Sequence, residues 1–101
     1  MARDAVARDA FPVELPRLLK ERGLSLRALA RELGGLDHGY LSRMINGRTA
    51  VNPRHAERIA IYLGLPGDYF AEVREAAVIA AIRANPQLRD AVYVDHVRAR
   101  R

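Results

Sequence analysis

The stretch 25–47 constrains the fold more than any other part of the chain, because it holds two short helical patterns separated by a glycine turn. In residues 26–33 apolar side chains recur at the spacing of one helix face, and Ser25 stands before them as a capping residue. Residues 37–46 repeat this arrangement with Asp37 as the cap, and glycine follows each pattern. The sequence therefore predicts two short helices joined by a tight turn.

The second of these helices has an apolar and a polar side. Its inward positions are Leu41, Met44 and Ile45, which follow helical spacing. The opposite side carries His38, Gly39, Ser42, Arg43 and Asn46. Because that side has no apolar contact to make, we expect it to stay outside the core.

Helical patterns extend over the rest of the chain, with Asn52-Pro53 and Asn85-Pro86 as two further start signals, each a capping residue followed by proline. No stretch alternates apolar and polar residues as a half-buried strand would. We therefore expect an all-α fold with helices over residues 13–22, 26–33, 37–46, 53–63, 68–84 and from 86 to the basic end. A short helix over 2–11 is expected to break at Phe11-Pro12, and Pro16 fits the next helix only in its first turn.

The helix expected over 68–84 is apolar on nearly all sides between Val73 and Ile82, so it must be buried on more than one side. One side can pack on the preceding helices. The other side needs either the last helix, through Leu88, Val92 and Val97, or a second subunit.

The net charge of +5 comes from seventeen basic and twelve acidic residues, and it suggests a polyanionic partner. Residues 1–66 carry eleven of the basic and seven of the acidic residues, so the excess lies in the first two-thirds of the chain. The chain has no cysteine, no membrane-length apolar run and no apolar signal segment near residue 1. We expect a soluble cytoplasmic protein.

Nothing in the sequence suggests an enzyme. The three histidines have no metal-ligand spacing, the only serines are Ser25 and Ser42, and no glycine-rich phosphate loop follows a strand. His55 and His96 are expected to be solvated. We therefore predict no catalytic residues, no metal and no cofactor.

Three segments carry a family resemblance: LSLRALARELG, YLSRMINGR and IAIYLGLPGDYF. In this order they resemble the phage Cro-and-repressor, or Xre, type of helix-turn-helix protein across about residues 13–70. The resemblance implies a lambda-repressor-like five-helix bundle, extended here by the C-terminal helices. It also implies a sequence-specific double-stranded DNA-binding transcriptional regulator, a repressor, that reads the major groove with helix 37–46.

Carried onto this sequence, the resemblance puts His38 and Gly39 where base edges are first met and Arg43 at a base-reading position one turn later. The planar guanidinium of Arg43 can donate two hydrogen bonds to guanine. Tyr40 would reach a phosphate or a thymine methyl group, and Ser42 lies on the same helix. The phosphate-binding cap and loop positions would be those of Ser25, Arg27, Asn46, Arg48 and Thr49.

The chain departs from the family pattern in four places. Leu26 stands where the family often has a phosphate-binding glutamine, so Arg27 or Ser25 would supply that contact. The turn over 34–37 and the loop over 48–52 are each about one residue longer than usual. Ile45 stands where an acid is common, which suggests an additional apolar contact.

The predicted organisation is an N-terminal extension over 1–12, a DNA-binding domain over 13–70 and C-terminal helices over 71–101 that pack on the same core. The C-terminal helices are expected to form a homodimer, because operators commonly mirror a two-fold protein. The alternative is an antitoxin-like interaction module, in which these helices bind a partner protein and DNA binding serves autoregulation.

Overall fold

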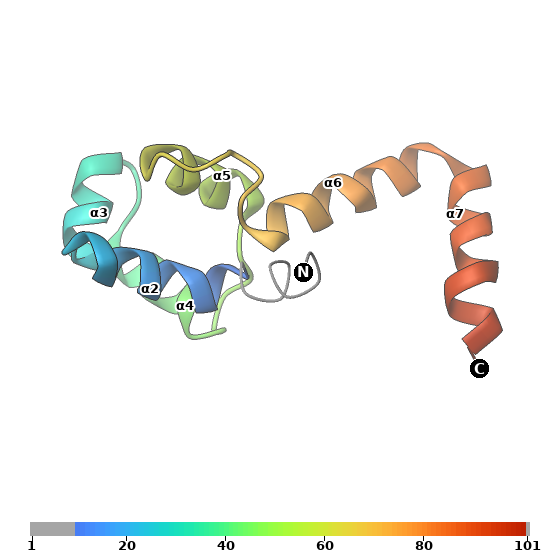
Figure 1. Ribbon diagram of the computed structural model, residues 1–101, viewed down its shortest axis with the longest axis horizontal. Helices are drawn as coiled ribbons and strands as arrows, with labels where there is room; N and C mark the ends of the chain where they lie inside the picture. Colours follow the sequence, from blue (N-terminus) through green and yellow to red (C-terminus); the bar gives the residue numbers. More distant parts are fainter. Residues whose placement is uncertain (1–9, 101) are drawn as a thin grey trace.

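The computed structural model describes residues 10–100, so most of the helix expected over 2–11 lies outside the described residues. It is all-α, as the sequence predicts, and no strand occurs in the described range. Figure 1 shows its helices: α2 (Phe11–Arg22), α3 (Leu26–Leu33), α4 (His38–Ile45), α5 (Pro53–Tyr62), α6 (Ala71–Ala84) and α7 (Pro86–Val92). Two short helical segments, η1 (Tyr93–Val97) and η2 (Arg98–Arg100), continue α7.

The core lies among α2, α3, α4 and α5, and the predicted inner faces of these helices form it. Its buried apolar side chains are Phe11, Leu15, Leu18, Leu19, Leu29, Ala30, Leu36, Leu41, Met44, Ala56, Ile59, Ala60, Leu63 and Phe70. The rings of Phe11 and Phe70 meet edge to face with centroids 5.0 Å apart, which joins the start of α2 to the segment before α6.

Four helices begin at the capping residues that the sequence predicts. The side chains of Ser25, Asp37, Asn52 and Asn85 each accept a hydrogen bond from a backbone N–H in the first turn of α3, α4, α5 and α7. These caps satisfy donors that have no partner within the helix, so they fix where each helix starts.

The helix expected from residue 13 begins two residues earlier, at Phe11, so Pro12 lies in its first turn and the non-helical residue before it is Ala10, whose backbone is extended. Burial of the Phe11 ring draws this residue into the fold, and the carboxylate of Glu72 accepts its backbone N–H at 2.9 Å. Pro16 consequently lies inside α2, beyond the first turn where we expected it. It removes one hydrogen bond from the helix.

Glu14 is a buried acid, and its burial was not expected from the pattern of residues along α2. It is 4% exposed on the inner side of α2 and accepts hydrogen bonds from the guanidinium of Arg17 and the hydroxyl of Tyr69. A buried carboxylate is tolerated only with such partners. The hydrogen bond to Glu14, together with burial, raises the pKa of Tyr69 above its ordinary value.

The helix expected from residue 68 starts at Ala71. Phe70 is fully buried and holds an extended backbone conformation, which places its ring in the core before the helix begins. The acid in the first turn is therefore Glu72 and not Asp68.

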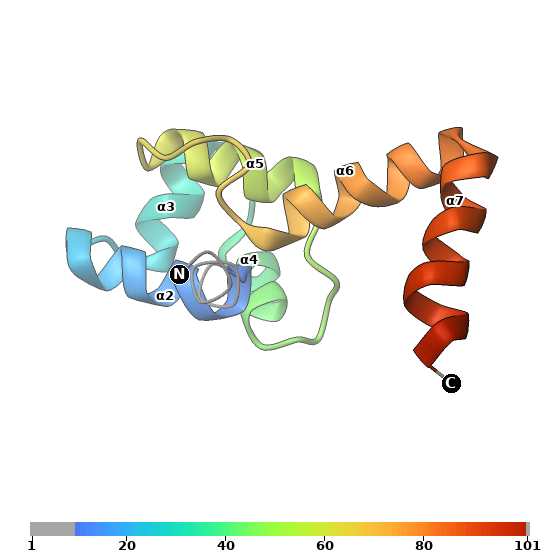
Figure 2. The same cartoon turned by 45° about the vertical axis from the view of Figure 1, so that its right-hand side comes forward.

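The C-terminal helices project from the core, although we expected them to pack on it. Val73 packs against the core, but among the described residues of α6, α7 and their continuation none is buried. Figures 1 and 2 show α6 leading away from α2–α5 and α7 turning sharply at its end. Within residues 10–100, no helix combines the length and the apolar character needed to cross a membrane.

Candidate nucleic-acid interface

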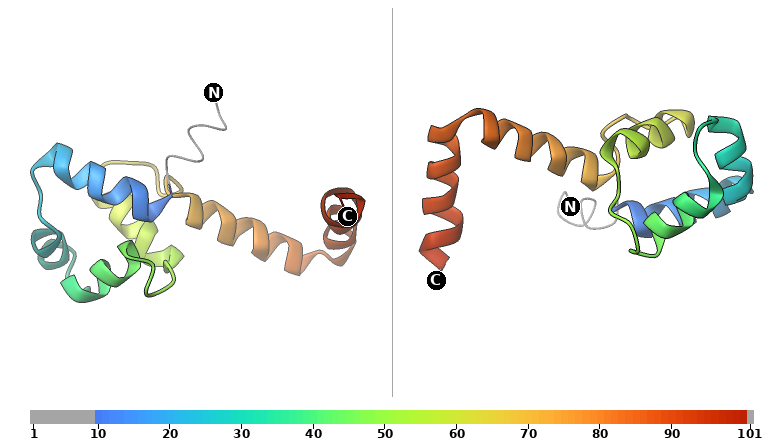
Figure 3. Two further views of the ribbon diagram at one scale, coloured as in Figure 1. Left: turned by 90° about the horizontal axis from the view of Figure 1, so that it is seen from below. Right: turned by 180° about the vertical axis from the view of Figure 1, so that it is seen from behind.

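The helix α4 is fixed by its apolar side and open on its polar side. Leu41 and Met44 have no exposed surface, and Ile45 packs partly against the core. Helix α4 contacts both α2 and α3, and the two views of Figure 3 show it beside α2. Arg43 and Asn46 are exposed, whereas His38, Gly39 and Ser42 are half-buried.

The start of α4 combines a bare backbone with two opposite charges. A side chain at Gly39 would meet Nη1 of Arg43 at 3.5 Å and the carboxylate oxygens of Asp37 at 3.6 Å. The exposed guanidinium of Arg43 therefore lies beside Gly39. Because Gly39 has no side chain, the backbone next to this guanidinium is left uncovered. An exposed planar donor next to accessible backbone suits recognition of a base edge.

Tyr40 links α4 to α5 through His55. The Tyr40 hydroxyl lies 2.8 Å from Nδ1 of His55, and the two rings meet edge to face. His55 is thus a half-buried partner of Tyr40, and not the solvated residue that we expected. The pair holds the orientation of α4 relative to α5.

The turn between α3 and α4 is held by Leu36 and Arg58, two residues that sequence reasoning missed. Gly34 and Gly35 have φ of 63° and 71°, which glycine adopts readily. Leu36 follows them and is only 8% exposed, so the longer turn is anchored in the core. Nη2 of Arg58 donates to the carbonyl oxygen of Leu33 at 2.6 Å. An apolar residue in a polar turn, Leu36, was a weak sequence signal that the turn is anchored in the core. No sequence signal indicated the role of Arg58.

The loop after α4 folds back onto the end of that helix. The backbone N–H groups of Arg48 and Thr49 both donate to the carbonyl oxygen of Arg43, at 2.9 and 3.3 Å. Nδ2 of Asn46 donates to the hydroxyl of Ser42 at 3.3 Å. The Arg48 side chain is exposed and Thr49 is half-buried, so the loop presents its arginine next to α4.

The remaining two predicted site residues lie at the start of α3. The hydroxyl of Ser25 accepts a hydrogen bond from the N–H of Ala28 at 3.0 Å, and Arg27 is exposed in the first turn. Among residues 10–100, no group of three or more His, Asp or Glu side chains is placed to hold a metal ion.

A short helix that is anchored by its apolar side, exposed on its polar side and joined to the preceding helix by a tight turn defines a helix-turn-helix DNA-binding unit. A protein-family model described as Helix-turn-helix matches residues 17–70, more than half of the chain. The chain belongs to this family, in its Xre and lambda-repressor-like type, and is a DNA-binding transcription regulator. Comparisons with curated proteins and with solved structures gave no match.

Proposed function

We propose that the chain is a homodimeric transcriptional repressor that reads the major groove of its operator with α4. The observation that carries this proposal is the exposed guanidinium of Arg43 beside the bare backbone of Gly39. Both residues lie on a helix that is fixed from behind by Leu41 and Met44. Such a helix can enter the groove without rearranging the core.

The proposed contacts divide into those that read bases and those that hold phosphates. Arg43 and His38 would contact base edges, with Gly39 allowing close approach. Since the hydroxyl of Tyr40 bonds to His55, Tyr40 would chiefly hold α4 in position while its ring edge meets the DNA. The phosphate contacts would come from Ser25, Arg27, Ser42, Asn46, Arg48 and Thr49.

The test is to select bound sequences from random duplex DNA with the full chain, and then to compare alanine variants on the selected site. We expect Arg43→Ala to lose preference at one base pair, a loss of about 1–3 kcal/mol of discrimination. Arg48→Ala should weaken binding to all duplexes nearly alike, because a phosphate contact carries no sequence information. Arg83→Ala, an exposed arginine of α6, is the matched control and should change neither property.

Failure to enrich any sequence would refute a sequence-specific regulator. An equal loss of discrimination in the Arg43 and Arg48 variants would refute the assignment of roles.

A second candidate is the antitoxin-like module, which the exposed apolar side chains of the C-terminal helices favour. Val78, Leu88, Tyr93 and Val97 are 41–56% exposed in the single chain. If a different protein covers them, the purified chain should be monomeric and should bind an apolar-surface dye until that partner is added. A stable dimer that binds its selected duplex would instead support the repressor.

A further inference from the structure

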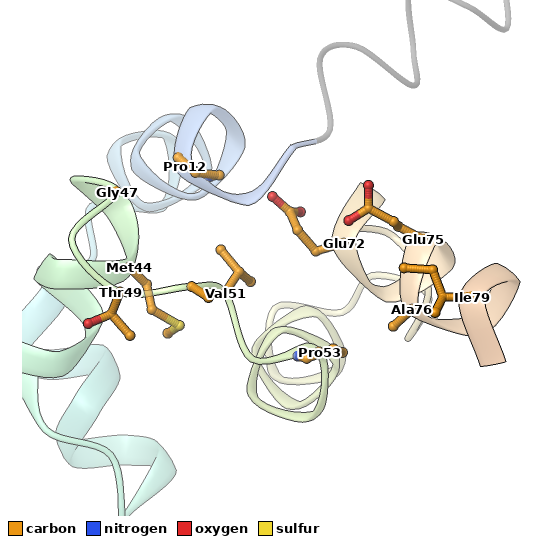
Figure 4. A pocket seen from close by; sticks show the side chains of 11 residues that line it. Pro12, Met44, Gly47, Thr49, Val51, Pro53, Glu72, Glu75, Ala76 and Ile79 are labelled. Carbon is orange, nitrogen blue, oxygen red and sulfur yellow. The ribbon is translucent and has the colours of Figure 1, made fainter. Parts of the chain in front are cut away.

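A groove of about 410 Å³ lies between the start of α2, the loop after α4 and the first half of α6. Figure 4 shows that its wall includes Val51, Pro53 and Ile79, which are apolar, and the acidic side chains of Glu72 and Glu75 on α6. Among the described residues that line it, none is basic. The groove therefore suits an apolar segment that carries positive charge.

The two acids of the groove have different roles. Glu72 accepts the backbone N–H of Phe11, at 2.9 Å to Oε1, and so caps α2. Glu75 lies almost one turn further along α6 and is exposed. A basic partner in the groove would consequently meet Glu75 without disturbing the cap on α2.

The segment 86–100, here called the C-terminal arm, has the matching properties. Its exposed apolar side chains are Leu88, Tyr93, Val94 and Val97, each 39–46% exposed. Tyr93 and Val97 are one helical turn apart, so they share a side of the arm. Near the end of the arm Arg98 and Arg100 are exposed, and the acids of the arm come earlier in the chain. The arm thus combines an apolar side with a basic end.

The arm cannot reach the groove of its own chain in this arrangement. Asn85 alone separates α6 from α7, and its side chain caps α7 by accepting the N–H of Leu88. The lining residue nearest to the arm along the chain is Ile79, and the six residue steps from there to Asn85 span about 9 Å of helix. Figure 1 shows the arm running across the far end of α6, on the side of that helix away from the core. An occupant of this kind has to come from another molecule.

We propose that the groove receives the C-terminal arm of a second copy, and that two copies exchange arms reciprocally about a two-fold axis. Arg98 and Arg100 of one copy face Glu75 of the other, while Tyr93 and Val97 cover the apolar wall near Ile79. A second copy is the occupant that these observations favour, because one chain carries both the acidic groove and the basic arm. The inference rests on the homodimer of the proposed function and specifies its interface.

The exchange would also reach the DNA-binding surface. Gly47 and Thr49 line the groove, and Thr49 follows Arg48 in the loop that folds back onto α4. An arm in the groove therefore packs against the loop proposed to hold a phosphate. Dimer formation and the order of that loop become coupled.

The experiment measures the dissociation constant of the full-length dimer by sedimentation. Glu75→Arg places like charges at both exchanged contacts, as does the double variant Arg98→Glu/Arg100→Glu. Each variant alone should raise the dissociation constant by about tenfold or more. An equimolar mixture of the two should recover dimers, because the mixed dimer pairs an acidic arm with a basic groove and a basic arm with an acidic groove.

Matched controls reverse a charge outside the interface, at the exposed residues Glu57→Arg on α5 and Arg83→Glu on α6. They should leave the dissociation constant unchanged. Val97→Asp is a second test of the arm that makes no charge pair, and it should also weaken the dimer. Helicity measured by circular dichroism confirms that every variant is folded.

A monomeric wild-type chain, a dimer that ignores these reversals, or a mixture that does not recover would overturn the exchange. An arm variant that binds DNA more weakly while its dimer dissociation constant is unchanged would also overturn the exchange, since the arm would then contact DNA. Binding of the selected duplex is measured on the same samples. A chain that binds this duplex while failing the charge exchange loses the inference but keeps the DNA-binding function. A chain whose mixed charge variants recover dimers but that binds no duplex keeps the inference and loses the DNA-binding function.

Discussion

Replacing Gly39 by alanine should stabilise the protein while weakening its binding to DNA. Gly39 lies in the first turn of α4 with an ordinary helical backbone, and the nearest atoms to an added Cβ are 3.5 Å away, at Nη1 of Arg43. This is a normal contact, so the methyl group fits. Alanine in a helix is favoured over glycine by about 0.5–1 kcal/mol. For a domain of this size we expect the melting temperature to rise by about 2–8 °C.

The same methyl group fills the surface through which α4 would approach a base edge. We therefore expect Gly39→Ala to bind the selected duplex more weakly, even though it is more stable. Urea unfolding followed by circular dichroism gives the stability, and titration of a labelled duplex gives the affinity. The two measurements should move in opposite directions.

Gly34→Ala is the matched control for backbone conformation. An added Cβ at Gly34 would meet nothing within 4 Å, but its φ of 63° with ψ of 146° is unfavourable for alanine. This variant should lose about 1–3 kcal/mol of unfolding free energy. If Gly39→Ala is also destabilising, the helical start of α4 is wrong. If it is stable and binds DNA normally, Gly39 does not face the DNA closely.

Three further predictions concern the partner, the cap on α2 and the buried acid. The affinity for the selected duplex should fall with salt at a logarithmic slope of about −0.9 per phosphate contact, and a slope near zero in a salt titration would contradict the docking of α4. Glu72→Ala should lower the unfolding free energy by about 1–2 kcal/mol, because the N–H of Phe11 loses its charged acceptor at the start of a helix; Glu57→Ala, at an exposed acid of α5, is the control and should change it by less than about 0.5 kcal/mol in the same urea experiment. The raised pKa of Tyr69 means that its hydrogen bond to Glu14 contributes fully below the ordinary tyrosine pKa of 10.0. That contribution should be lost as pH rises through the folded-state value, so alkaline unfolding should be less steep in Tyr69→Phe, and identical pH profiles would refute the coupling.

The starts of α3, α4, α5 and α7 were predictable from sequence because capping is a local interaction. Ser25, Asp37, Asn52 and Asn85 each bond to a backbone group two or three residues away, so the chain near each cap contains the information. The inner sides of the helices were predictable for the same reason, since periodicity is visible in a short window.

The errors arose where a distant partner overrides the local preference. Phe11-Pro12 has the local character of a break, but Phe70 and Glu72 draw it into α2 from the other end of the domain. The burial of Glu14 depends on Tyr69, which lies 55 positions away in the chain. Neither partner can be identified from the spacing of residues along one helix.

In the candidate site, the periodicity of the sequence predicted which side of α4 is polar. It did not predict which residues hold α4 in place. The contact between Tyr40 and His55 joins residues on two helices, and Arg58 reaches the end of α3 from α5. These interactions depend on how the helices pack. The sequence predicts which face of α4 is exposed, and tertiary packing decides how that face is held.

The contacts among Phe11, Phe70 and Glu72 determine where this protein can be cut and rejoined to others. The family match over residues 17–70 includes Phe70 but excludes both of the other residues. A chimaera that transplants only 17–70 into another regulator would uncover one side of the Phe70 ring and delete the first half of α2. Transplanting 10–73 would carry these three residues and Val73, which packs against the core. A graft designed from sequence similarity alone would therefore begin seven residues too late and end three residues too early.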